Sequence, residues 1–140
     1  MPMRKREAQK IIQQNTIMNK WITDKGFILH VGGNQWYKNR RGVCEIYGEV
    51  YKLREKKMME TQPLILAGKK PTKEIIEFIQ NNKHLKVLFV VSPSNEEINA
   101  LYCMAKLLLF PSIKEGFGWP IVEAMACGCP VVTTNREPMT

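Results

Sequence analysis

The chain has 140 residues, of which 44% are hydrophobic and 24% are charged, so one globular domain is expected and an intrinsically disordered chain is excluded. Apolar runs such as LLLF at 107–110 are far shorter than the roughly 20 residues of a membrane-spanning helix, and we expect a cytoplasmic protein without a signal peptide. The net charge of +8 indicates either solvated basic surfaces or an anionic partner.

The first 26 residues are basic and carry a loosely amphipathic helical pattern, with Ile11, Met18 and Ile22 on one side. We expect residues 1–26 to form an amino-terminal extension or a linker helix. The remaining residues, 27–140, alternate short apolar segments with helical patterns, and they are predicted to form the main domain.

Five short apolar segments of this domain are predicted to be buried strands. They are FILHV (27–31), PLILAG (63–68), LKVLFVV (85–91), LLLFPS (107–112) and VVTT (131–134). The segments between them have apolar residues at helical spacing, and two of these helices have boundary signals. Ser94 and Glu97 form a capping box at the start of one helix. Pro120 suits the first turn of the last helix, and Gly128 suits its end.

Strands that alternate with helices favour a parallel sheet with helices on both faces, so we predict an α/β, Rossmann-like fold. In the strand order 3-2-1-4-5 of such folds, the order reverses between the first and the fourth strand. Ligands bind beyond the carboxyl ends of the strands at that point. The segment GGNQWYKNRRG (32–42) follows the first strand, and IKEGFG (113–118) follows the fourth. Both segments are therefore expected to lie at one crevice.

Glycines and a helix start make this crevice suitable for an anion. Gly33, Gly116 and Gly118 permit a ligand to approach the backbone closely. The helix that begins near Trp119 offers free backbone N–H groups, which bind anions at helix amino termini. The sequence therefore predicts that backbone groups bind a phosphate here.

Charged side chains of the same segments suit a ligand that carries both phosphate and hydroxyl groups. Lys38, Arg40 and Arg41 can supply positive charge to a phosphate. Glu115 and Glu123, on either side of the glycine turn, can accept hydrogen bonds from hydroxyl groups. A nucleotide sugar combines an anionic centre with hydroxyl groups at both ends, and it is the ligand that we expect.

Other classes of function fit the residues less well. A nicotinamide dehydrogenase would have GxGxxG after the first strand, which GGNQWYK does not, and AGKKPT is not a Walker loop. The four cysteines and two histidines lack metal-ligand spacing, so we expect reduced thiols and no metal. No nucleic-acid-binding motif accompanies the basic runs, and we expect no nucleic acid partner. Peripheral contact with an anionic membrane stays open.

The segment PSIKEGFGWPIVEAMACGCPVVTTN resembles the signature of retaining glycosyltransferase family 4, of the GT-B class, in which two glutamates stand on either side of GFG. FILHVGGNQWYKNRRGV is similar to the first strand and phosphate loop of the same domain. The resemblance covers residues 27–140 and implies the carboxy-terminal, donor-binding half of a GT-B fold, truncated before its end. It also implies transfer of a sugar from a nucleotide-diphosphate sugar in polysaccharide or glycoconjugate biosynthesis, without a metal or other cofactor.

The resemblance implies roles for individual residues. Glu115 would contact hydroxyl groups of the donor sugar, and Glu123 would hold the ribose. Three backbone N–H groups would meet the sugar and the diphosphate: those of Phe117, Gly118 and Trp119. The end of the third strand would border the base.

The sequence departs from the family pattern in the phosphate loop. Arg41 matches the basic residue that binds the diphosphate. A basic residue usually follows the first-strand glycine, where this chain has Gly33 and Asn34, and Lys38 or Arg40 is expected to substitute for it. A glycine commonly ends the third strand, and this chain has Val–Ser–Pro (91–93) at that point.

The chain has no counterpart of the amino-terminal domain that carries the acceptor site in GT-B enzymes. We therefore predict that the isolated chain lacks turnover and needs that missing acceptor domain as a partner. The alternative is a non-catalytic nucleotide-sugar binding module or a degenerate fragment.

Overall fold

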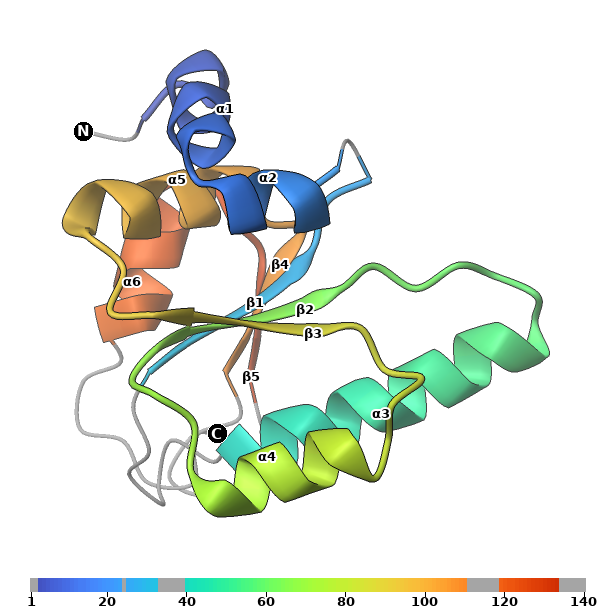
Figure 1. The fold of residues 1–140 in the computed structure, drawn as a ribbon. Helices are drawn as coiled ribbons and strands as arrows, with labels where there is room; N and C mark the ends of the chain where they lie inside the picture. The colour runs from blue at the N-terminus through green and yellow to red at the C-terminus, as the bar shows by residue number, and fades with distance from the viewer. Residues whose placement is uncertain (1–2, 24, 33–39, 111–118, 134–140) are drawn as a thin grey trace.

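The computed structural model describes residues 3–23, 25–32, 40–110 and 119–133 (Figure 1). In this part of the chain a parallel sheet lies between two layers of helices, with α3 and α4 on one face and the other helices on the opposite face. The strands are β1 (Ile28–Gly32), β2 (Leu64–Gly68), β3 (Val87–Val91), β4 (Leu107–Phe110) and β5 (Val131–Thr133). The helices are α1 (Lys5–Gln14), α2 (Thr16–Trp21), α3 (Arg40–Lys56), α4 (Lys73–Gln80), α5 (Asn95–Met104) and α6 (Trp119–Ala126).

The strand order in the sheet is β3-β2-β1-β4-β5, and each pair of neighbours is parallel. The predicted α/β fold, its parallel sheet and its strand order are therefore confirmed. β1 pairs with β2 on one side and with β4 on the other, so the order reverses beside β1. The carboxyl ends of β1 and β4 consequently lie next to each other at one edge of the sheet.

Both faces of the sheet are buried, as the continuous apolar strands predict. Successive side chains of β2 point to opposite faces, because the side-chain period of a strand is two residues. Leu64 and Leu66 pack with Tyr47 of α3 in one cluster. Ile65 and Ala67 belong to a second cluster on the face covered by α1, α5 and α6. Two hydrophobic cores therefore hold the central strands in place from both sides.

The amino-terminal helices α1 and α2 pack onto the second core. Ala8, Ile12 and Met18 are buried there, and α1 contacts α5 along its length. Asn15 caps α2 by accepting hydrogen bonds from two backbone N–H groups, and its amide donates to Glu97 Oε2 at 3.1 Å. This polar contact joins the start of α2 to the first turn of α5.

The boundary signals that the sequence predicts are present. The Ser94 side chain accepts from Glu97 N at 3.1 Å, and Glu97 Oε1 accepts from Ser94 N at 3.0 Å, which completes the capping box of α5. Pro120 is the second residue of α6. Gly128 follows α6 with φ of +77°, the left-handed conformation that commonly ends a helix.

Candidate functional site

A cavity of about 340 Å³ opens beyond the carboxyl ends of three neighbouring strands. We call it the carboxyl-edge cavity. Its lining comes from the ends of β1, β2 and β3 and from the first turns of α5: Val31, Gly32, Gly68, Lys69, Ser92, Pro93 and Ile98. This is the edge of the sheet at which ligands bind in open α/β folds.

Two glycines let β1 and β2 approach each other closely at the floor of this cavity. Gly32 and Gly68 are partners in the strand register, and Gly68 has φ of +138°. A Cβ atom built on Gly68 would lie 2.1 Å from the carbonyl oxygen of Gly32. Since atoms of side chains and backbone do not approach that closely, only glycine fits at Gly68. The backbone is therefore left uncovered at the place where a ligand would meet the ends of the strands.

The residue that follows β3 contacts the end of β2, at the same floor of the cavity, and its backbone has an unusual conformation. Ser92 has φ of +50°, and its backbone N–H donates a hydrogen bond to Gly68 O at 2.7 Å. The left-handed conformation costs a residue with a side chain roughly 1–2 kcal/mol. At the end of the third strand, where the family pattern has a glycine, this chain thus has a serine in a conformation that favours glycine.

Arg40 is the basic side chain that the structure brings to the end of β1. It is the first residue of α3, it is only 4% exposed, and its Nη2 donates to Gly32 O at 3.2 Å. Burial lowers the pKa of its guanidinium, and the nearby Cys44 opposes that change. Arginine stays protonated at neutral pH even so, and Arg40 brings positive charge to the carbonyl of Gly32, a residue that lines the carboxyl-edge cavity.

Arg41, which the sequence analysis expected at the diphosphate, points toward α4 in this structure. Its guanidinium carbon lies 4.9 Å from the centre of the Phe78 ring. Its nitrogens lie 3.4 Å from Glu45 and 3.8 Å from Glu74. Consecutive residues of a helix point about 100° apart. This rotation separates Arg41 from the end of β1, which Arg40 reaches.

Glu123 lies on α6, and its exposed carboxylate meets one buried side chain. The hydroxyl group of Tyr102, in α5, donates to Glu123 Oε1 at 3.4 Å. Tyr102 is fully buried, and its pKa is raised by that burial and by the carboxylate beside it. Ile98 lies one helical turn before Tyr102 on the same face of α5, and it lines the carboxyl-edge cavity. The carboxylate is thus joined through Tyr102 to α5, the helix that contributes Ile98 to the cavity.

Several predicted site residues lie outside the described part of the chain. They are Gly33, Lys38, Glu115, Gly116, Phe117 and Gly118. Trp119 begins α6, and only its backbone is described. The elements on either side of these segments are in place: β1 ends at Gly32 before α3, and β4 ends at Phe110 before α6.

The site includes residues that the sequence analysis did not single out. Gly68 had a visible signal, because it closes the apolar run PLILAG as Gly32 closes FILHV. Ser92 precedes a proline and gives no sign of a left-handed backbone. Tyr102 is one of several apolar residues at helical spacing, and nothing in the pattern indicates that its hydroxyl group contacts Glu123.

Among the described residues, no group of three or more His, Cys, Asp or Glu side chains could hold a metal ion. The four cysteines are free thiols, as predicted, and burial raises the pKa of Cys44 to about 11. No helix in the described ranges is long and apolar enough to cross a membrane. The carboxyl-edge cavity itself offers a ligand the backbone groups of Gly32, Gly68 and Ser92 and the side chain of Lys69, and Arg40 binds the Gly32 carbonyl beside it.

Residues 13–140 match the family model described as glycosyl transferases group 1. The chain is 34% identical over 119 residues to O-antigen chain mannosyltransferase B of Escherichia coli, a match that covers 79% of this chain and 29% of that protein. It is 33% identical over 100 residues to the MMP alpha-(1->4)-mannosyltransferase of Mycolicibacterium hassiacum, which covers 68% of this chain and 23% of that protein. The chain thus spans less than a third of the length of these relatives.

Solved structures have the same fold. HepE from Anabaena, crystallised with UDP and glucose, has a TM-score of 0.69 and 22% identity, over 94% of this chain and 34% of HepE. WaaG, a glycosyltransferase of lipopolysaccharide biosynthesis, also has a TM-score of 0.69, with 21% identity over 91% of this chain and 32% of WaaG. These likenesses establish the architecture of the described residues as that of one half of a GT-B protein.

Proposed function

Because the chain belongs to the group 1 glycosyltransferases, we propose that it is the donor-binding domain of a retaining enzyme of glycosyltransferase family 4. One observation carries the proposal: the carboxyl-edge cavity opens beyond the carboxyl ends of β1, β2 and β3, over uncovered glycine backbone, and it reaches β1, beside which the strand order reverses. The chain spans about a third of HepE and less of its curated relatives. Sugar transfer by the whole enzyme is accordingly part of the proposal.

The proposed donor is a nucleotide-diphosphate sugar. The structural relative HepE has been crystallised with UDP, with UDP and glucose, and with UDP-glucose. Several sequence relatives are mannosyltransferases, which supports a hexose as the transferred group. The cavity volume of about 340 Å³ lies in the range of small-molecule sites and suits a nucleoside better than a whole nucleotide sugar. The diphosphate and the sugar would then extend toward α6.

The residues take the following roles in this proposal. Glu123 accepts hydrogen bonds from the ribose hydroxyl groups, and Tyr102 orients its carboxylate. Glu115 contacts the donor sugar. Arg40 supplies positive charge near the diphosphate, a role that its position supports better than that of Arg41. The backbone N–H groups at the start of α6 bind the diphosphate, with the positive end of the helix dipole behind them.

In the chemistry proposed for the whole enzyme, the bond between the anomeric carbon and the diphosphate breaks while the acceptor oxygen bonds to that carbon on the same face, and the hydroxyl proton of the acceptor passes to the departing phosphate. Negative charge grows on the leaving phosphate, and prearranged N–H groups and basic side chains stabilise that charge. The nucleotide sugar is a substrate, and no metal or other cofactor takes part in the proposal. Both substrates must be held together away from water, which requires the acceptor domain. The isolated chain is therefore expected to bind donor without transferring sugar.

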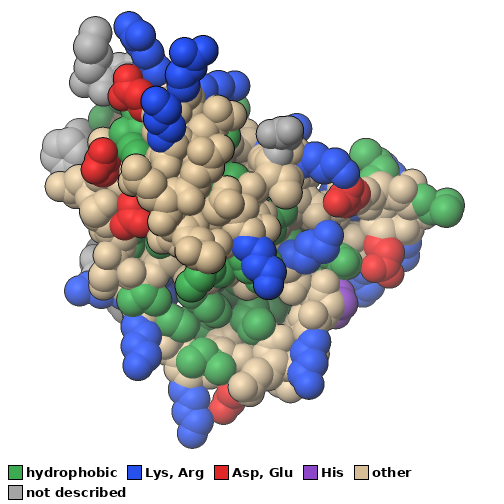
Figure 2. Space-filling model, turned by 45° about the horizontal axis from the view of Figure 1, so that its top comes forward, with side chains coloured by type: hydrophobic (Ala, Val, Ile, Leu, Met, Phe, Trp, Pro, Cys, Tyr) green, Lys and Arg blue, Asp and Glu red, His purple; other side chains and the backbone are tan. Residues whose placement is uncertain are grey.

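The exposed basic residues at the start of α1 support a peripheral contact with an anionic membrane at the cytoplasmic side. Figure 2 shows Lys and Arg side chains gathered over this helix, where Arg4, Lys5, Arg6 and Lys10 are exposed. Basic residues near a membrane surface attract anionic lipids at about 1 kcal/mol each. Co-sedimentation with phosphatidylglycerol vesicles tests this part: equal sedimentation with neutral phosphatidylcholine vesicles would exclude it.

Titration calorimetry with two variants tests the proposed site. Glu123→Gln should weaken the binding of a free nucleoside diphosphate and of its nucleotide sugar by similar amounts, because both ligands contain the ribose. Glu115→Gln should weaken the binding of the nucleotide sugar alone, by roughly 1–3 kcal/mol, the usual loss for a hydrogen bond to a charged group. Uridine, guanosine and adenosine diphosphates should be compared, since the base is not assigned.

Two outcomes would contradict the division of roles. If both variants lost affinity for nucleoside diphosphate equally, Glu115 would not be specific for the sugar. If neither variant changed any affinity, a degenerate fragment would be the better description. Tight donor binding by a full-length enzyme that never transfers sugar would favour the alternative of a non-catalytic binding module.

A further inference from the structure

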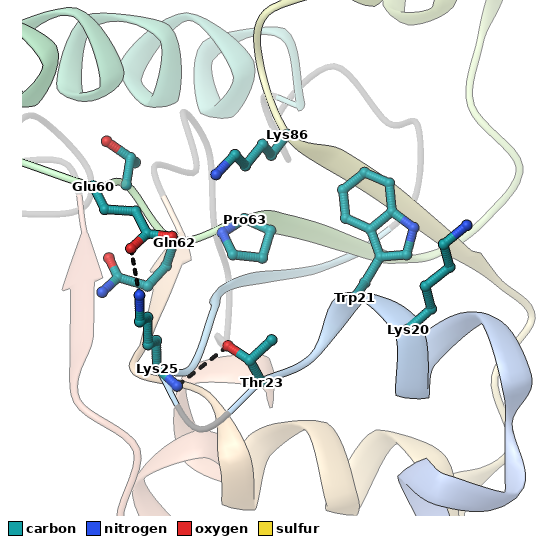
Figure 3. A pocket seen from close by; sticks show the side chains of 9 residues that line it. Lys20, Trp21, Thr23, Lys25, Glu60, Gln62, Pro63 and Lys86 are labelled. Atoms are coloured by element: carbon teal, nitrogen blue, oxygen red, sulfur yellow. Dashed lines mark hydrogen bonds and ion pairs between the residues drawn. The ribbon is translucent and has the colours of Figure 1, made fainter.

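A second cavity, of about 300 Å³, lies at the opposite edge of the sheet. It is formed where chain segments enter β1, β2 and β3, and we call it the amino-edge cavity (Figure 3). The strands between the two edges have five residues each and rise about 3.3 Å per residue, so roughly 15 Å of sheet separates the two cavities. A ligand in the amino-edge cavity would not overlap the proposed donor site.

The wall of this cavity formed by residues 60–63 is fixed by hydrogen bonds. Arg54 Nε donates to Glu60 O at 3.0 Å, and the hydroxyl group of the buried Tyr47 donates to Gln62 O at 2.8 Å. Ile28 N donates to Pro63 O at 2.9 Å. These contacts come from α3 and β1, and they order the segment before any ligand arrives. A preformed wall lowers the entropic cost of binding.

The lining combines flat apolar surfaces with amines. Trp21, at the end of α2, and Pro63 contribute the apolar surfaces, and Lys20, Lys25 and Lys86 contribute the positive charges. In the view of Figure 3, Lys86 extends above Pro63, between the Trp21 indole and the pair formed by Lys25 and Glu60. The cavity therefore places cationic groups around a surface on which a ring can lie.

The charges of this cavity do not cancel. Lys25 Nζ donates to Glu60 Oε2, and this hydrogen bond lowers the pKa of the Glu60 carboxyl, with smaller help from Lys86. Within the described ranges, neither Lys20 nor Lys86 forms an ion pair with a carboxylate. Two amines thus remain available to an anion, and the amide of Gln62 and the hydroxyl group of Thr23 can bond to polar substituents.

We propose that the amino-edge cavity is a second binding site, which takes a phosphate ester of a single sugar ring. The ring would lie on Trp21 and Pro63, and the phosphate would bind Lys86, which extends above Pro63. The volume is at the lower limit of small-molecule sites, which fits one ring and excludes a whole nucleotide sugar. The same chemistry occurs in a free sugar phosphate and in a lipid headgroup, and the experiment distinguishes these sources.

The experiment uses glucose 6-phosphate as the probe and follows the indole N–H resonance of Trp21, assigned with Trp21→Phe. Glucose 6-phosphate should shift this resonance, whereas glucose and inorganic phosphate should bind about tenfold more weakly, because each lacks one half of the contacts. Lys86→Gln should lower the affinity for glucose 6-phosphate about tenfold, as expected for loss of a hydrogen bond to a charged group. Saturating uridine diphosphate should leave the probe's affinity unchanged.

Lys73→Gln is the matched control, since it removes the same charge from an exposed position on α4. Equal loss of binding in Lys73→Gln and Lys86→Gln would reduce the effect to net charge and overturn the proposal. Inorganic phosphate that bound as well as glucose 6-phosphate would also overturn it, as would competition by uridine diphosphate. If glucose 6-phosphate caused no response, and Lys86→Gln weakened binding to phosphatidylglycerol vesicles, the lysines would belong to a lipid surface and the site would be refuted.

Discussion

Replacement of Gly68 by alanine should disrupt the floor of the carboxyl-edge cavity. The new Cβ would lie 2.1 Å from Gly32 O, more than 1 Å closer than the 3.4 Å at which ordinary contacts begin. Backbone strain at a φ of +138° costs about 1–3 kcal/mol, and displacement of Gly32 O would weaken its hydrogen bonds, at roughly 1 kcal/mol for one bond. We therefore expect Gly68→Ala to lower the free energy of unfolding by about 2–4 kcal/mol.

Gly48→Ala is the matched control for this prediction. Gly48 lies inside α3, where an added Cβ would meet Leu85 Cδ1 at an ordinary 3.7 Å. Alanine in a helix interior should therefore raise the free energy of unfolding, by about 0.5–1 kcal/mol. Urea unfolding followed by circular dichroism measures both variants. The reasoning about close strand approach is refuted if Gly68→Ala is as stable as Gly48→Ala, or if it binds nucleoside diphosphate as tightly as the wild type.

Four further predictions concern single side chains. Tyr102→Phe should weaken the binding of nucleoside diphosphate by about 0.5–1.5 kcal/mol, because the variant loses the hydrogen bond to Glu123. Tyr47→Phe also loses a hydrogen bond but should leave this binding unchanged in the same calorimetric titration. Met58→Gly should raise the urea midpoint, because Met58 lies just after the end of α3 with φ of +57° and is 95% exposed; an unchanged or lower midpoint would contradict this. Hydrogen bonds from Ser94 and Asn15 lower the pKa of Glu97 below its ordinary value of 4.5. The ionised carboxylate therefore contributes its full stability at pH values above 4.5, and this contribution is lost as the pH falls through the lowered pKa of the folded state. Glu97→Gln should remove this part of the acid dependence of the urea midpoint. Cys44, with its pKa raised to about 11, should react with iodoacetamide at pH 8 far more slowly than the thiol of the urea-unfolded chain.

The sequence predicted those features that depend on local pattern. Apolar runs bounded by glycines located the strands, because a strand buried on both faces needs a continuous apolar sequence. The capping box of Ser94 and Glu97 and the helix end at Gly128 follow from bonds within a few residues of each other. The strand order followed from the alternation of strands and helices, which leaves few topologies open.

Features that depend on contacts between distant residues were not predictable in this way. Asn15 and Glu97 are 82 residues apart, and Tyr102 and Glu123 are 21 apart, so only the packed structure brings each pair together. Whether Arg40 or Arg41 points to the end of β1 depends on the rotation of α3 about its axis. The sequence has adjacent basic residues here, and their order does not determine that rotation. The left-handed conformation of Ser92 likewise occurs together with a hydrogen bond to Gly68, which is 24 residues away in the chain.

We propose that this chain binds the nucleoside diphosphate part of a sugar donor at the carboxyl edge of its sheet. The most direct test is an amide chemical-shift map of the labelled chain titrated with uridine, guanosine and adenosine diphosphates. We predict that at least one of them shifts the amides of Gly32, Gly68 and Ser92 and the first turn of α6, and leaves Trp21 and Lys86 unchanged. Shifts confined to the amino edge of the sheet, or none with any of the three ligands, would contradict the claim.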